Sequence, residues 1–98
     1  MKLFHRTTLT AAKEIVRSGF RDGSGIFLTD NANYTGVWLS DRPLDSNEGA
    51  DGDALLEVIF DSSHGLEEFE WIEEGKGYRE WLVPAHIVNE RAKFKRIE

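Results

Sequence analysis

Polar side chains that could take part in chemistry gather at the ends of three predicted strands. His5-Arg6-Thr7 ends the first strand, Trp38-Leu39-Ser40 ends a second, and Glu80 leads a third. Polar residues that converge from strand ends across a small sheet give a rigid cleft its functional groups. One carboxylate with an aromatic wall and hydrogen-bond donors does not form the Ser–His pair that acyl transfer uses. Such a set can stabilise a sugar that develops oxocarbenium charge, because a fixed negative charge lowers the cost of that state.

The strand that carries Glu80 has a clear face pattern. Trp81, Leu82 and Val83 are strongly β-prone, and Pro84 cannot donate to a ladder, so it closes the strand. Alternation places Glu80 and Leu82 on one side and the other two on the opposite side. A glutamate in this position is either an exposed strand start, as most glutamates are, or an acid held at the edge of a cleft.

The remaining pattern predicts a β-rich α+β domain of about six strands and one main helix. The helix is expected from about Leu9 to Ser18, with an N-cap at Thr8 or Thr10 and Gly19 just after its end. Further strands are expected over Lys2 to Thr7, Gly36 to Ser40, Ala54 to Phe60, Leu66 to Ile72 and Ala92 to Ile97, with a turn over Pro84 to Asn89.

Composition narrows the classes of function. The chain has 98 residues, no cysteine and a formal charge of −6, which disfavours binding to a nucleic-acid backbone. It contains no run of about 20 apolar residues and no signal-peptide pattern, so we expect a cytoplasmic protein that does not enter a membrane. Its three histidines lack metal-ligand spacing, and the acidic loop over residues 44–53 lacks a calcium-binding register, so no metal site is predicted.

Three stretches resemble, in the same order, motifs of the ADP-ribosyltransferase fold. His5-Arg6-Thr7, followed by a helix that ends in Gly19-Phe20, looks like the opening of that family. Gly36-Val37-Trp38-Leu39-Ser40-Asp41 looks like its second motif, and Tyr78-Arg79-Glu80-Trp81-Leu82-Val83-Pro84 is similar to its glutamate strand. The ordered set spans most of the chain. It implies a single, minimal-size ADP-ribosyltransferase-like domain over residues 1–98, with split, mostly antiparallel sheets.

The resemblance implies an NAD site of the His-Tyr-Glu type. Glu80, His5 and Trp38 would be catalytic, with Glu80 holding the nicotinamide ribose and steadying the oxocarbenium. His5, Arg6, Thr7, Trp38 and Ser40 would bind NAD, which is a substrate. Arg6 replaces the family's usual glycine and Trp38 its tyrosine. Arg6 and Ser40 could instead supply the arginine and serine of the family's Arg-Ser-Glu branch.

The activity implied by the resemblance is transfer of ADP-ribose from NAD to an acceptor such as a protein. Two alternatives stay open. One is a non-catalytic protein-binding module on the same fold, since the chain is shorter than most active members. The other is an NAD glycohydrolase, for which water is the acceptor. Transfer of an RNA 2′-phosphate is disfavoured by the acidic composition.

Overall fold

The computed structural model describes residues 1–26, 33–44 and 52–98, in which β-strands predominate. In chain order the elements are β1 (Lys2–Thr7), α1 (Leu9–Ser18), β2 (Gly23–Ile26), β3 (Asn33–Ser40), β4 (Ala54–Phe60), the 3-10 helix η2 (Glu67–Phe69), β5 (Glu70–Trp71), β6 (Glu80–Val83), α2 (Ala85–Arg91) and β7 (Ala92–Arg96). The strands form one sheet in the order β5-β6-β3-β1-β4-β7, β2 also pairs with β3, and every pairing is antiparallel. The predicted α+β class is confirmed.

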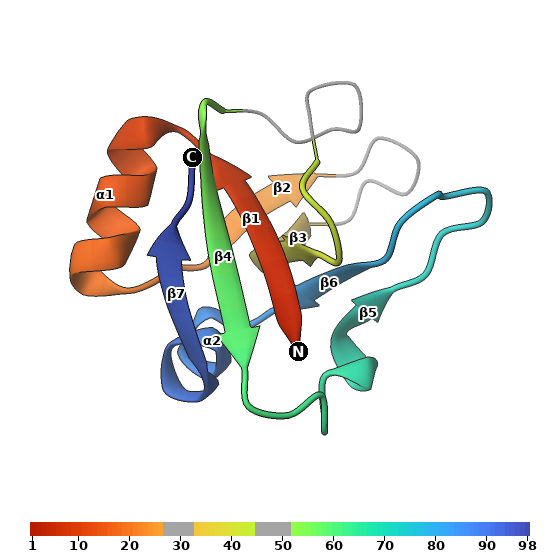
Figure 1. Cartoon of the computed structure of the whole chain (residues 1–98). Coiled ribbons are helices and arrows are strands. Elements are labelled where there is room, and N and C mark those ends of the chain that lie inside the picture. The colour runs from red at the N-terminus through yellow and green to blue at the C-terminus, as the bar shows by residue number, and fades with distance from the viewer. Residues whose placement is uncertain (27–32, 45–51) are drawn as a thin grey trace.

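The pairing between β1 and β3 is the shortest in the sheet, and we call it the narrow contact. These strands share one residue pair, Phe4 with Ser40, whereas β1 pairs with β4 along its whole length. Figure 1 shows β1 and β4 running upright while β6 and β5 run across them. The predicted division into split sheets therefore needs correction, because the strands form one sheet joined at this narrow contact.

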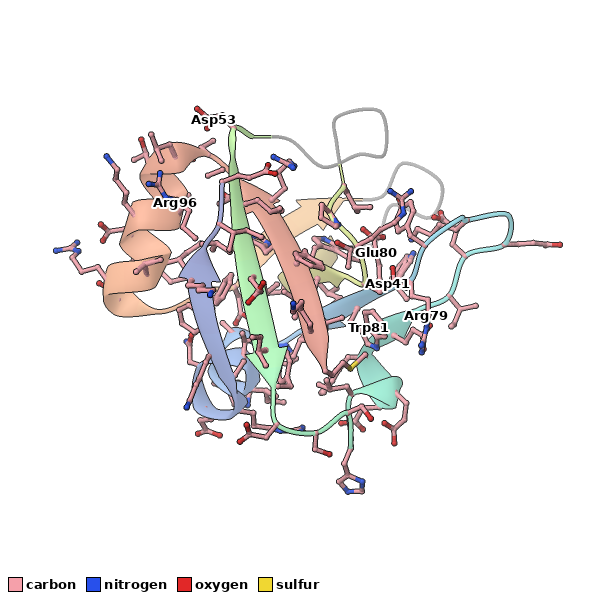
Figure 2. The ribbon with its side chains drawn as sticks, viewed as in Figure 1. Asp41, Asp53, Arg79, Glu80, Trp81 and Arg96 are labelled. Carbon is pink, nitrogen blue, oxygen red and sulfur yellow. The ribbon has the colours of Figure 1, made fainter. Side chains whose placement is uncertain are left out.

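Helix α1 has the bounds that its sequence predicted, because local signals fix both ends. The Thr8 hydroxyl accepts a hydrogen bond from the Ala11 amide at 3.1 Å. Asp53, which precedes β4, accepts from the Leu9 amide at 2.9 Å (Figure 2). Gly19 follows the last turn with φ of 90°, in the region that favours glycine, and its amide donates to the Ile15 carbonyl.

The hydrophobic core lies between one face of the sheet and the two helices. Alternation along each strand brings the apolar residues to this face. The buried members from the strands are Leu3, Val37, Leu39, Ala54, Leu56, Val58, Phe60, Trp81 and Val83. Ala12 of α1 and Val88 of α2 cover them. We call this the helix face and the other side of the sheet the open face.

Several segments differ from the prediction. Strand β2 (Gly23–Ile26) was not expected, and β3 begins at Asn33 rather than Gly36. The expected turn over Pro84 to Asn89 is helix α2, whose seven residues are too few for helix formation without tertiary support. That support comes from the Asp22 carboxylate, which accepts from the Ala85 amide at 2.8 Å, and from burial of Val88. The expected strand over Leu66 to Ile72 is η2 followed by the two-residue β5.

Two further predictions concern membrane-spanning helices and the acidic loop over residues 44–53. Among the described residues, no helix is long and apolar enough to cross a membrane. Most of the predicted acidic loop over residues 44–53 lies outside the described residues; only Leu44, Gly52 and Asp53 belong to the described part.

Candidate functional site

A row of candidate site residues crosses three neighbouring strands on the open face. Ser40 of β3 stands opposite Phe4 of β1 and also opposite Glu80 of β6. Arg6 lies two positions beyond Phe4, and alternate strand residues share a face. Arg6, Ser40 and Glu80 therefore lie on the same side of the sheet. We call these three residues the open-face row.

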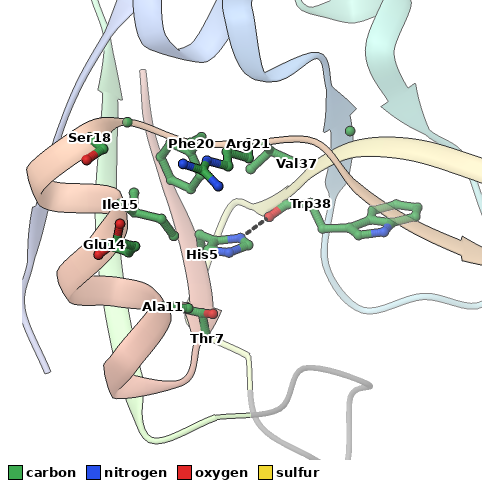
Figure 3. A pocket seen from close by; sticks show the side chains of 12 residues that line it. His5, Thr7, Ala11, Glu14, Ile15, Ser18, Phe20, Arg21, Val37 and Trp38 are labelled. Carbon is green, nitrogen blue, oxygen red and sulfur yellow. Dashed lines mark hydrogen bonds between the residues drawn. The ribbon is translucent and has the colours of Figure 1, made fainter.

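His5 and Thr7 lie on the opposite, helix face. They are neighbours of Arg6 along β1, so alternation turns them toward α1, and both line a pocket there (Figure 3). The His5 Nδ1 atom lies 2.7 Å from the Trp38 carbonyl oxygen. This contact bridges β1 and β3 beside their single residue pair. The structure therefore brings His5 and Thr7 together, but it does not bring either of them to Glu80.

Trp38 contributes to both faces. Its carbonyl oxygen contacts His5 on the helix face, but its indole lies on the open face, since Trp38 pairs with Leu82, two residues along from Glu80. The indole packs edge to face against Trp71, with ring centroids 5.4 Å apart. Trp71 stands opposite Glu80 in the β5–β6 pair. The two indoles therefore form an aromatic wall next to the carboxylate.

The Glu80 carboxylate is held by a lysine that the sequence had not singled out. Lys76 Nζ lies 2.5 Å from Glu80 Oε2 and 3.3 Å from Glu73 Oε2, and its side chain is only 9% exposed. Desolvation lowers the pKa of Lys76, but its hydrogen bond and ion pair with Glu80 outweigh this and raise the pKa overall. The ammonium also lies 5.1 Å from the Tyr78 ring centroid. Lys76 is therefore a fixed cation beside Glu80 at neutral pH.

Arg6 and Ser40 are positioned by the segment that follows β3. The Ser40 hydroxyl donates to the Arg42 carbonyl at 2.7 Å and is largely buried. The Arg6 guanidinium donates to the Leu44 carbonyl and, at 3.2 Å, to the Glu98 carboxylate. Residues 41–44 therefore pass over this part of the open face and fix both side chains. The Asp41 amide donates to the Arg79 carbonyl at 3.0 Å, so this segment begins beside the start of β6 (Figure 2).

Sequence reasoning missed Lys76 because it lies in a glycine-rich connection that gives no strand or helix signal. The available signal was its spacing, since Lys76 precedes Glu80 by four residues and follows Glu73 by three. Such spacing indicates an ion pair only when the segment is helical or turns back on itself. The turn that produces this proximity became clear only in the structure.

Comparison with protein-family models, with curated proteins and with solved structures found no match. The function is therefore inferred from the ordered motifs and from the geometry of the described residues.

Proposed function

We propose that this chain is an ADP-ribosyltransferase-like protein that binds NAD on the open face through Arg6, Ser40 and Glu80. The observation that supports this most directly is the common face of the open-face row, set by the Phe4–Ser40 and Ser40–Glu80 pairings. This arrangement favours the Arg-Ser-Glu alternative over the His-Tyr-Glu set, because His5 lies on the other face.

The residues of the row fit the parts of NAD. A guanidinium such as that of Arg6 suits a diphosphate, because its planar donors match phosphate oxygens. The indoles of Trp38 and Trp71 offer apolar ring surface for a flat nicotinamide or adenine ring. The Glu80 carboxylate can accept a hydrogen bond from a ribose hydroxyl. For the row to make these contacts, Arg6 must exchange its bonds to Glu98 and to the Leu44 carbonyl, and Glu80 its bond to Lys76. Residues 41–44 must also move from Ser40, which is only 5% exposed and donates to the Arg42 carbonyl.

In the proposed reaction, Glu80 stabilises the positive charge that forms on the nicotinamide ribose. The bond between ribose C1′ and the nicotinamide nitrogen breaks, and nicotinamide leaves as a neutral molecule with the bond electrons. A nucleophilic atom of the acceptor then bonds to C1′ and gives up its proton to solvent water. The negative charge of Glu80 lowers the energy of the oxocarbenium-like transition state between these events.

The test is nicotinamide release and transfer of label from radiolabelled NAD in a lysate of acceptor proteins. Glu80→Gln should lower both rates by at least about 100-fold, the usual effect of losing one transition-state charge contact. Glu73→Gln is the matched control, because Glu73 also contacts Lys76 but lies outside the row. Glu73→Gln should stay within a few-fold of wild type. Equal rates for wild type and Glu80→Gln would refute the transferase.

His5→Gln distinguishes the two versions of the site. If the open-face row carries the reaction, His5→Gln leaves nicotinamide release within a few-fold of wild type, because His5 lies on the helix face. If the reaction uses the His-Tyr-Glu set, release falls with His5→Gln as it does with Glu80→Gln. The second result would overturn the assignment to the open-face row but not the transferase itself.

The second candidate is a binding module without turnover. The observation in its favour is charge pairing: Lys76 neutralises Glu80, and Glu98 pairs with Arg6. A carboxylate that is already paired stabilises a developing cation less than a free one does. Saturable NAD binding measured by calorimetry, with no release of nicotinamide by any variant, would identify this candidate.

A further inference from the structure

A pocket of about 410 Å³ lies between α1 and the helix face of the sheet. This volume falls in the range of small-molecule sites, roughly 300 to 1,000 Å³. Figure 3 shows His5 near its centre, with α1 on one side and the segment around Phe20 and Arg21 on another. Its apolar walls come from Ala11, Ile15, Phe20 and Val37. The pocket lies on the opposite side of the sheet from the open-face row.

His5 offers one hydrogen-bond acceptor to this pocket. Its Nδ1 atom faces the Trp38 carbonyl oxygen, which can only accept, so Nδ1 carries the ring proton. Burial lowers the pKa of His5, although the bond to Trp38 partly offsets this, so the ring is neutral at pH 7. Nε2 then has a free lone pair. None of the described residues forms a hydrogen bond to Nε2. Among the described residues, no side-chain nitrogen or oxygen atom is both buried and without a hydrogen-bond partner.

The wall beside His5 is aromatic and firmly held. The ring of Phe20 meets the imidazole edge to face, with centroids 5.3 Å apart and planes at 83°. Phe94 packs edge to face against Phe20, with ring centroids 4.9 Å apart. The backbone of Phe20 is fixed by Asn89, whose side chain accepts from its amide and donates to its carbonyl. A flat ring can therefore pack against a preformed aromatic surface.

The charges of the pocket lie at its rim. Glu14 lines the pocket from α1 and pairs with Arg17, and Arg21, which also lines it, is exposed. Inside, the only ionisable side chain from β1 is His5, which is neutral. Beside the neutral His5 ring the walls are apolar, so a charged ligand placed there would lose its hydration, and this part of the pocket disfavours ions. A neutral ring with one donor would satisfy Nε2 and bury most of its remaining surface against the apolar walls, while Thr7 and Ser18 supply the other polar side chains of the lining.

We infer that this pocket is a separate small-molecule site that binds a neutral heteroaromatic compound carrying one N–H donor, which His5 Nε2 accepts. The site does not depend on the proposed NAD function, because it lies on the other face of the sheet and none of Arg6, Ser40 and Glu80 lines it. Trp38 is common to both, since it lines the pocket and offers its indole on the open face.

The test uses three small probes and amide chemical shifts of the ¹⁵N-labelled full chain. Indole should give saturable shifts at Ala11, Ile15, Gly19 and Val37. 1-Methylindole, which lacks the donor, should bind about tenfold more weakly, because it leaves the acceptor unpaired. 3-Methylindole is the matched control: it adds the same methyl group but keeps the N–H. If 1-methylindole and 3-methylindole bind equally, His5 is not the acceptor and the inference fails.

Two variants test which residues of the pocket bind the probes. His5→Phe keeps a ring but removes the acceptor, so it should bind indole and 1-methylindole equally. Ile15→Trp fills the pocket and should remove binding of all three probes, while well-dispersed amide spectra confirm that it folds. Retained indole binding in Ile15→Trp would overturn the location.

Competition with NAD distinguishes this inference from the proposed function. NAD should not displace indole if the sites lie on opposite faces. Displacement would show that the pocket belongs to the NAD site, and the inference of a separate site would fall. Absence of NAD turnover with intact indole binding would refute only the transferase.

Discussion

Asn89 links α2 to the chain that leaves α1, and its removal should destabilise the fold. Its side-chain oxygen accepts from the Phe20 amide at 2.8 Å, and its nitrogen donates to the Phe20 carbonyl at 2.9 Å. Asn89→Ala deletes both bonds while the Phe20 ring stays buried. The two backbone groups of Phe20 then depend on water that reaches them past the exposed flank of the helix.

The expected loss of folding stability follows from the usual free-energy contribution of such hydrogen bonds. A hydrogen bond contributes about 0.5–1.5 kcal/mol net, and a buried group left unpaired costs about 1–3 kcal/mol. Asn89 is itself exposed, so water can partly rehydrate the Phe20 backbone groups in the variant. We therefore expect a loss of stability at the lower end of these values, about 1–2 kcal/mol. In a domain of this size each kcal/mol shifts Tm by about 4–8 °C, so Tm should fall by about 5–15 °C.

Urea unfolding followed by tryptophan fluorescence measures this loss, with thermal unfolding as a second reading. The matched control is Glu90→Ala, which truncates the next exposed residue of α2 and should change stability by less than about 0.5 kcal/mol. If Asn89→Ala matched Glu90→Ala, the two bonds to Phe20 would contribute nothing, and the preformed aromatic wall would need another explanation.

Three further perturbations test other contacts. Gly52→Ala should cost more than about 3 kcal/mol in urea unfolding, because φ is 130° and a Cβ would lie 2.1 Å from the Thr7 carbonyl oxygen. Burial lowers the pKa of His5, so the unfolded chain takes up a proton that the folded chain resists. Stability should fall as pH drops through about 6.5 and below, and His5→Gln should show a smaller fall. Lys76→Met should cost about 1–2 kcal/mol at pH 7. A double-mutant cycle should show a smaller cost when Glu80 is also changed to Gln, with the pair to Glu73 accounting for the remainder.

The sequence predicted those elements whose signals are local. Helix α1 has a capping threonine before it and a glycine after it, and its bounds Leu9–Ser18 were correct. The apolar run Ala54–Phe60 was likewise correct as a central strand. Helix α2 was missed because its first amide bonds to Asp22, 63 positions away in the chain, and no local signal reports such a partner.

The candidate site was predictable only within each strand. Alternation correctly gave Glu80 and Leu82 one face of their strand, since Glu80 pairs with Ser40 and Leu82 with Trp38. Which residues of β1 share that face depends on register, and a shift of one residue exchanges the two faces completely. The observed pair Phe4–Ser40 selects Arg6 rather than His5. A single pairing across the narrow contact thus determines which residues of β1 share a face with Glu80.

Neighbouring residues of β1 point to opposite faces of the sheet. Mutations on the two faces should therefore change folding stability almost independently. Side chains with no shared partner usually give free-energy changes that add within about 0.5 kcal/mol. His5 and Glu80 share no side-chain contact, so the effects of His5→Gln and Glu80→Gln on stability should add. Trp38 is the exception, since its carbonyl holds His5 while its indole lies on the open face. Trp38→Phe keeps this carbonyl but removes the packing of the indole against Trp71, so it should alter NAD binding directly and indole binding through a shift of the backbone that carries the carbonyl. If it altered only one of them, the backbone at Trp38 would hold His5 independently of the indole's packing against Trp71.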